Sequence, residues 1–317
     1  MRPLAVLAVL ALSTAAHADM LLVGNKGGDS VSYIDLDTGR EVSRRPVTAA
    51  APHEIAVSPD GRRAAVVHYG AQSLDILDIA TREVVETVSL PDGSRPHGIA
   101  WLDDGRIVAT AEGTDSVVVV RDGKVTAIPT GQEGTHMLAV HADAQRLYTA
   151  NMGSASVSLV DLDAGETLRS VPVGVEPEGI AVVGDEVWVS DRGGDAVYVL
   201  DAATLDTLAR IDVGRFPLRI LASPDGRHAV TSNLRDGTVS VIDTATREVE
   251  RTIRVSGSDQ TQQVTLLFSP DGSRLYVAET GANKIAEIDF ASGTLLGRLS
   301  GGSQGDGLAI AAKPTGD

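Results

Sequence analysis

The stretch Pro52-His53-Glu54-Ile55-Ala56-Val57-Ser58-Pro59-Asp60-Gly61 decides the fold, because its first half recurs along the whole chain. It reads as a short apolar strand followed by a turn of the Asp-Gly type. Variants of this phrase begin at six further positions, which are Pro96, Thr135, Pro177, Pro217, Gln263 and Gly305. The seven copies lie 39 to 46 residues apart, which is close to the period of about 40–45 residues that is typical of a β-propeller blade.

Each repeat holds four short strands. A first apolar strand, an Asp-Gly type turn, a second strand and a Gly-rich turn precede two alternating strands, such as Ser73–Ile79 and Glu83–Leu90. Helical periodicity is absent, and Pro and Gly gather at the joints, which disfavours alternating strands and helices. The sequence therefore predicts an all-β, seven-bladed β-propeller with four antiparallel strands in each blade.

The two ends of the chain complete one blade together. The seventh copy stops after one strand, Leu308–Ala312, whereas the chain begins with three strands that lack a first one: Leu21–Gly24, Ser30–Leu36 and Arg40–Val47. We expect the C-terminal strand to pair with these three and to close the ring, since closure removes exposed sheet edges.

The first residues have the pattern of a secretory signal. Arg2 precedes an apolar run, Leu4–Leu12, and small residues follow up to Ala18. We expect cleavage before Asp19 and a single propeller domain over residues 19–317, in the periplasm or secreted. The apolar run is shorter than the roughly 20 residues that span a bilayer, so we expect no transmembrane segment.

Composition limits the chemistry. The formal net charge is -16 and aromatic residues make up 3% of the chain, so nucleic acid is not an expected partner. With no cysteine, the chain has neither disulfides nor thiolate metal ligands. We expect a monomer, and the sequence indicates no protein partner.

The second strands of the repeats carry a family resemblance. They read Leu147-Tyr148-Thr149-Ala150-Asn151, Val187-Trp188-Val189-Ser190-Asp191 and Leu275-Tyr276-Val277-Ala278-Glu279 in three of the repeats. In these motifs the chain resembles the YVTN-repeat, YncE-like β-propellers, which are related to lactonase-type propellers. The resemblance implies the fold, and a choice among binding roles, lactone hydrolysis and binding of d1-type haem.

Two positions in each blade are expected at one mouth of the central channel, where propellers usually bind ligands. The first position precedes the innermost strand and is occupied in turn by His53, His97, His136, Glu178, Leu218, Val264 and Asp306. The second lies between the second and third strands and is occupied by His68, Glu112, Asn151, Asp191, Asn233, Glu279 and Asn25.

Histidines on consecutive blades suggest a metal site. We interpret one set as candidate ligands for a divalent Zn, Cu, Fe or Ni ion: His53, His97, His136, Glu178 and His68. The alternative is that a histidine after proline only caps the strand through a hydrogen bond to a neighbouring group. On the opposite arc Arg192, Arg219 and Arg235 could hold a carboxylate or phosphate, or pair with Asp191, Asp195 and Asp236.

Three functions follow from this arrangement. The first is a binding or accessory protein that takes a metal ion or a small ligand at the mouth. The second is a lactonase-like hydrolase or a lyase, in which His97 or His136 is the base, Glu178 or Glu112 orients it, and Arg219 steadies an oxyanion. The third is a tetrapyrrole site with one histidine as axial ligand.

Overall fold

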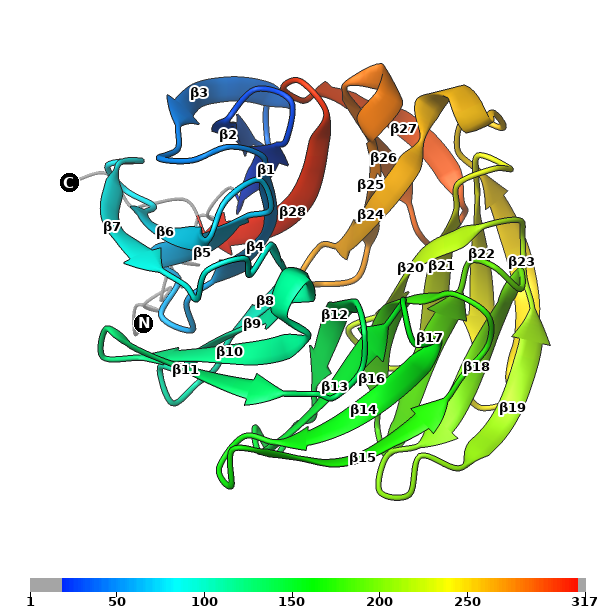
Figure 1. Cartoon of the computed structure of the whole chain (residues 1–317). Helices are drawn as coiled ribbons and strands as arrows, with labels where there is room; N and C mark the ends of the chain where they lie inside the picture. Colours follow the sequence, from blue (N-terminus) through cyan, green and yellow to red (C-terminus); the bar gives the residue numbers. More distant parts are fainter. Residues whose placement is uncertain (1–18, 313–317) are drawn as a thin grey trace, which may run out of the picture.

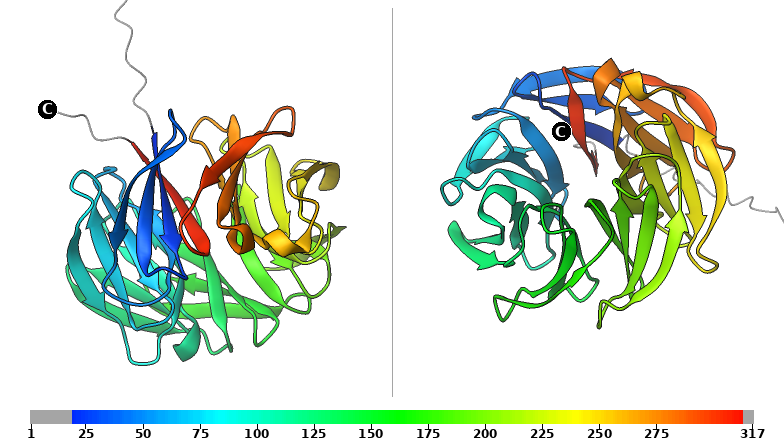
Figure 2. Two further views of the ribbon diagram at one scale, coloured as in Figure 1. Left: turned by 90° about the horizontal axis from the view of Figure 1, so that it is seen from above. Right: turned by 45° about the vertical axis from the view of Figure 1, so that its right-hand side comes forward.

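The computed structural model describes residues 19–312, which form seven four-stranded antiparallel sheets. The sheets are arranged as the blades of a ring around a central axis (Figures 1 and 2). Each innermost strand contacts the innermost strands of the blades on both sides. The predicted seven-bladed propeller is confirmed. The predicted signal peptide, residues 1–18, lies outside the described residues.

Each blade runs from an innermost strand at the axis to an outermost strand at the rim. In that order the first three blades are β28 (Gly305–Ala312), β1 (Asp19–Asn25), β2 (Ser30–Asp35), β3 (Arg40–Pro46); β4 (Pro52–Val57), β5 (Arg63–His68), β6 (Ser73–Asp78), β7 (Val84–Ser89); and β8 (Pro96–Trp101), β9 (Ile107–Ala111), β10 (Ser116–Arg121), β11 (Lys124–Pro129).

The fourth and fifth blades are β12 (Thr135–Val140), β13 (Arg146–Asn151), β14 (Ser156–Asp161), β15 (Glu166–Pro172); and β16 (Pro177–Val183), β17 (Glu186–Asp191), β18 (Ala196–Asp201), β19 (Thr207–Asp212). The last two are β20 (Pro217–Ala222), β21 (His228–Asn233), β22 (Thr238–Asp243), β23 (Glu248–Arg254); and β24 (Gln263–Phe268), β25 (Arg274–Glu279), β26 (Lys284–Asp289), β27 (Thr294–Ser300). Short 3-10 turns, η1 (Glu112–Thr114), η2 (Asp259–Thr261) and η3 (Thr280–Ala282), occupy three connections.

The hydrophobic core is divided among the spaces between blades. The second and third strands are buried on both faces, whereas the outermost strands alternate between exposed and half-buried residues, as in β3. Tyr148 of the fourth blade packs in one cluster with Val187 of the fifth, and Trp188 packs between the fifth and sixth blades. Strands covered on both faces explain the nearly continuous apolar runs in the sequence. Within residues 19–312 no helix is both long and apolar enough to cross a membrane.

The chain ends close the ring as expected. β28 pairs antiparallel with β1, and Met20 lies opposite Ala311 and Leu22 opposite Ala309. In Figure 2 the red strand β28 lies beside the blue strand β1. The observed strand begins at Gly305, three residues earlier than predicted. Those three residues include Asp306, which therefore lies at the centre of the ring.

Hydroxyl groups on the second strands join neighbouring blades. Thr110 Oγ1 accepts a hydrogen bond from the Gly98 amide of its own blade over 2.8 Å and donates to the carbonyl oxygen of His136 in the next blade over 2.5 Å. Ser190 and Ser232 make the same pair of bonds between later blades. These bonds fix the innermost strands relative to one another at the height of the candidate site.

Candidate functional site

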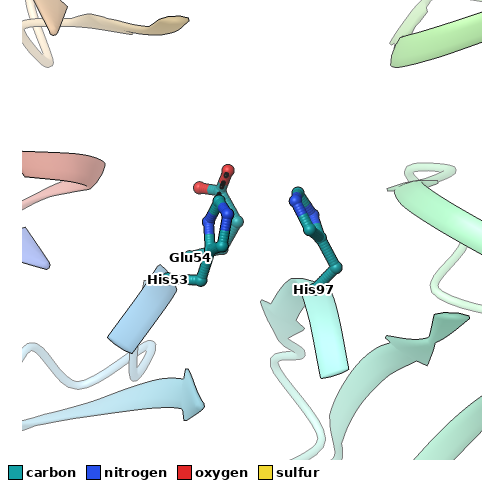
Figure 3. A group of neighbouring side chains, drawn as sticks. All are labelled: His53, Glu54 and His97. Atoms are coloured by element: carbon teal, nitrogen blue, oxygen red, sulfur yellow. Dashed lines mark ion pairs between the residues drawn. The ribbon is translucent and has the colours of Figure 1, made fainter. Parts of the chain in front are cut away.

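A β-bulge at the start of each innermost strand places the site residues. Pro52 pairs with His68 and Ile55 pairs with Val66, so β4 has one more residue than β5 over this interval. The same register shift occurs in all six other blades. A bulge re-aims consecutive side chains that would otherwise point to opposite faces. As a result His53 and its neighbour Glu54 both project toward the centre of the ring (Figure 3).

Three of the predicted histidines form a row. The ring centroids of His53 and His97 are 4.1 Å apart, and those of His97 and His136 are 3.7 Å apart. All three side chains are buried. The structure therefore brings together the histidines that the sequence places at equivalent positions of three consecutive blades. We call these three, with Glu54, Glu178, Arg219 and Asp306, the central cluster.

His53, Glu54 and His97 each offer a ligand atom, and these atoms lie within 4.8 Å of one another. The Nδ1 atoms of both imidazoles are buried and have no hydrogen-bond partner within residues 19–312. On the other side of its ring, His53 Nε2 lies 3.5 Å from Asp306 Oδ2. Burial lowers the pKa of His53 to about 4 and also lowers that of His97. Both rings are thus neutral near pH 7, which is the form that binds a metal.

His136 differs from the other two histidines. Its Nδ1 lies 2.7 Å from Glu112 Oε2 and its Nε2 lies 3.6 Å from Glu178 Oε1. Burial disfavours the charged ring, but hydrogen bonds to the two glutamates outweigh it and raise the pKa of His136. Both ring nitrogens face carboxylates, so His136 is an ionic partner rather than a ligand with a free nitrogen.

A buried ion network surrounds Glu178. Arg219 Nη1 donates to Glu178 Oε1 over 2.7 Å, and Arg192 Nη1 donates to Glu178 Oε2 over 2.5 Å. Burial opposes its ionisation, yet the bond from His136 and the charge of Arg219 lower the pKa of Glu178 to about 2. Arg219 Nη2 also donates to Glu54 Oε1 over 3.1 Å. Glu178 is surrounded by Arg219, Arg192 and His136, so its carboxylate belongs to this network. It lies outside the group formed by His53, Glu54 and His97.

The three predicted arginines take different places. Arg219 is buried in the central cluster, and Arg192 lies at its edge with Glu176 and Glu178. Arg235 instead lies over the ring of Phe216, at 4.5 Å from its centroid. The partners of Arg192 and Arg219 are glutamates, not the aspartates that the sequence suggested. Those aspartates bind elsewhere, since Asp191 accepts from backbone amides, Asp236 pairs with Arg215, and Asp195 accepts from the Phe216 amide.

The second predicted position lies at the corner between the second and third strands of each blade, and its residues mainly hold this corner together. The Nδ2 atoms of Asn25, Asn151 and Asn233 each donate to two hydroxyl groups on the next strand. His68 contacts the next strand of its blade in the same way: its Nδ1 lies 3.0 Å from Ser73 Oγ and its Nε2 lies 3.4 Å from Asp75 Oδ2. The structure therefore places His68 inside its blade and outside the group with His53. Among the seven corner residues Glu112 reaches the cluster, through His136.

The residue after the corner is the one that borders the cluster in three blades. Lys26 Nζ lies 2.8 Å from Asp306 Oδ2, and Tyr69 lies edge-on to the rings of His53 and His97, with centroids 5.5 Å away. Arg192, after Asp191, is the third. These side chains are more exposed than the cluster, so they mark the side on which it meets solvent. Sequence reasoning missed Lys26, Tyr69 and Glu54, although shifting the repeat alignment by one residue would have found them.

With this geometry established, comparison with known proteins identifies the family. The family model described as YNCE-like beta-propeller matches residues 6–107 and 184–294, more than half of the chain. The chain belongs to the YncE-like β-propeller family.

Relatives span different lengths of the chain. The uncharacterized protein YncE of Salmonella typhi is 26% identical over 226 residues, which cover 64% of this chain and 61% of YncE. The chain thus matches about three fifths of that relative. Protein NirF of Pseudomonas aeruginosa is 26% identical over 302 residues, covering 84% of this chain and 73% of NirF. The structure of virginiamycin B lyase from Staphylococcus aureus superposes with a TM-score of 0.69 at 15% identity, over 80% of this chain and 85% of the lyase, and this likeness concerns the fold alone.

Proposed function

We propose that the protein is an exported binding protein that holds a divalent metal cation at the centre of its ring, with His53, Glu54 and His97 as ligands. One observation carries the proposal. Two buried imidazoles on neighbouring blades have Nδ1 atoms without a hydrogen-bond partner among the described residues, and a carboxylate lies beside them. A buried polar atom without a partner costs free energy, and a cation would remove that cost.

The donor set suits a transition metal. Two neutral imidazoles and one carboxylate are found at zinc sites and at ferrous sites that keep open coordination positions. Asp306 supports this role, because a metal-binding histidine commonly donates its other ring N–H to a carboxylate. The 3.5 Å between His53 Nε2 and Asp306 Oδ2 favours a proton on Nε2 and an unprotonated Nδ1. Zinc, iron, copper and nickel are therefore the ions to test.

Metal titration tests this proposal. Protein purified without a His-tag and stripped of metal is titrated with Zn²⁺, Ni²⁺ and Cu²⁺, and without oxygen with Fe²⁺, by calorimetry. We expect one ion per chain. Removing a group that hydrogen-bonds to a metal ligand typically lowers metal affinity 10–100-fold, and a ligand itself matters at least as much. His97→Ala and His53→Ala should therefore lose affinity by about 100-fold or more. His228→Ala is the matched control, because His228 is half-buried and pairs with Glu250 away from the cluster.

The proposal fails if the stripped wild-type protein binds none of the four ions, or if His97→Ala binds them as wild type does. Circular dichroism of each variant separates loss of a ligand from loss of the fold. The visible absorption spectrum of the same preparation tests the tetrapyrrole alternative.

A second candidate function, lactone hydrolysis or lyase chemistry, is favoured by the pair of His136 and Glu112. A carboxylate 2.7 Å from Nδ1 orients an imidazole as in acid–base catalysis. Because the pKa of His136 is raised, the ring would act first as a proton donor. Turnover of a lactone panel that disappears in His136→Ala and persists in His228→Ala would support this function.

A further inference from the structure

Arg219 carries a donor that no group in the described chain accepts. Its side chain is buried, with 5% of the residue exposed. Nη1 donates to Glu178 Oε1 and Nη2 donates to Glu54 Oε1, whereas Nε has no hydrogen-bond partner within residues 19–312. A guanidinium group has five N–H donors in a fixed fork. The edge formed by Nε and Nη2 is therefore half used, by Glu54 alone.

Glu54 links this edge to the proposed metal. Its Oε1 lies 3.1 Å from Arg219 Nη2 and 4.0 Å from His53 Nδ1. If the carboxylate moves onto a cation, Arg219 loses one of its two anionic partners. A buried charge without full compensation is costly, so metal binding would create a demand for an anion next to the metal.

The geometry of the Nε–Nη2 edge of Arg219 indicates which kind of anion would bind there. Nε–H and Nη2–H point in parallel and match the two oxygens of a planar carboxylate. Nη1 stays bound to Glu178, so the guanidinium offers one edge rather than several. Glu178 accepts a hydrogen bond from Arg219 Nη1, and Asp306 is a second buried carboxylate near Arg219, so the two would repel a dianion such as phosphate more strongly than a monoanion. A small monoanion with two coplanar oxygens fits best.

We propose that the metal-loaded site binds a small carboxylate, which accepts hydrogen bonds from Nε and Nη2 of Arg219 beside the cation held by His53, Glu54 and His97. This inference rests on the proposed function. Arg219 is then the residue that recognises the carboxylate ligand. Glu54 binds Arg219 in the metal-free protein and binds the cation in the metal-loaded protein.

The test uses Co²⁺-loaded full-length protein, whose visible absorption bands report on ligands near the metal. Acetate, azide and inorganic phosphate are titrated into wild type, Arg219→Lys and the control Arg210→Lys, in which an exposed arginine paired with Asp212 is changed. Lysine keeps the charge but lacks the fork. We expect acetate to bind about tenfold more weakly to Arg219→Lys, with azide, which cannot fill two parallel donors, little changed.

Equal acetate affinity in wild type and Arg219→Lys would overturn the inference while leaving metal binding intact. Absence of Co²⁺ bands in wild type would instead overturn the proposed function, and with it this inference. If circular dichroism shows that Arg219→Lys does not fold, the relative affinities of the wild-type protein for acetate and phosphate decide. The wild-type protein should bind acetate about tenfold more tightly than phosphate, and the reverse order would contradict the inference.

Discussion

The Nδ1 atom of His136 lies 2.7 Å from Oε2 of Glu112, although the two residues belong to different blades. The ring of His97 lies between the other two imidazoles, tilted by 48° from His53 and 37° from His136, and forms no ion pair with a carboxylate among the described residues. The pKa is therefore raised at one end of the row, on His136, and lowered on His53 and His97. This division separates the ring that forms an ion pair from the two that have nitrogens free for a ligand.

Replacing Glu112 by Gln should lower the pKa of His136, because of the two glutamates that oppose the effect of burial only Glu178 then remains. A histidine whose pKa is raised in the folded state stabilises the protein below its unfolded pKa, and this contribution disappears as pH rises through the folded pKa. We expect Glu112→Gln to cost about 2 kcal/mol at pH 6 and less at pH 9. NMR titration of the ring protons and urea unfolding measure both effects. Glu250→Gln, at the exposed partner of His228, should change stability by less than about 1 kcal/mol.

His53 should make the protein sensitive to acid. Its pKa is lowered to about 4 by burial, so between pH 6.5 and 4 the unfolded chain binds a proton that the folded protein does not. Stability from this group is complete above pH 6.5 and declines by up to about 1.4 kcal/mol per pH unit as the pH falls. In His53→Asn the fall of the urea midpoint between pH 7 and pH 5 should be smaller than in wild type. Equal slopes would contradict the burial of a neutral ring, and His228→Asn serves as the control.

Gly307 should not tolerate a side chain. A Cβ added there would lie 2.0 Å from the carbonyl oxygen of His53, and a backbone atom cannot move aside as a flexible side chain can. We expect Gly307→Ala to destabilise the protein by about 1–3 kcal/mol and to weaken metal binding through displacement of His53. Gly297→Ala is the matched control, since a Cβ added at Gly297 would have nothing within 4 Å. Similar unfolding midpoints for the two variants would show that β28 can move away from β4.

Loss of the closing strand should destabilise the whole ring rather than one blade. A chain that ends at Ser300 lacks β28, so β1 and the innermost strands β24 and β4 lose their neighbour. We expect this truncation to remove most of the roughly 5–15 kcal/mol that stabilises a domain. Circular dichroism and limited proteolysis compare it with a chain that ends at Ala312 and keeps β28. Cooperative unfolding of the shorter chain at the same midpoint would mean that closure contributes little.

The fold was predictable from the sequence because each repeat encodes one blade. Apolar second and third strands, turn residues between them and an incomplete blade at each end determine the number of blades and the closure. The row of His53, His97 and His136 was predictable for the same reason, since equivalent positions of a repeat occupy equivalent places around an axis. These conclusions need only the periodicity of the chain.

The rest of the cluster depends on details that periodicity does not contain. Glu54 follows His53 directly, and in a regular strand it would point to the opposite face; the bulge changes this, and alternation of apolar residues does not reveal a bulge. The corner role of His68 depends on its contacts with Ser73 and Asp75, which the period of the repeat does not encode. The sequence did hold a signal for that role, because Asn25, Asn151 and Asn233 are each followed by hydroxyl residues five and seven positions later.

The bulges of the innermost strands also separate the residues of the central cluster from the residues whose pairing holds the blades together. In six of the seven blades two adjacent residues lie between the paired residues on either side of the bulge, and in the blade of His136 one residue does. Where neighbouring strands approach too closely, as at Gly98, Gly179 and Gly307, one of the two is glycine. Substitutions at these positions are therefore expected to alter the central cluster while the strand pairing of the blades stays unchanged.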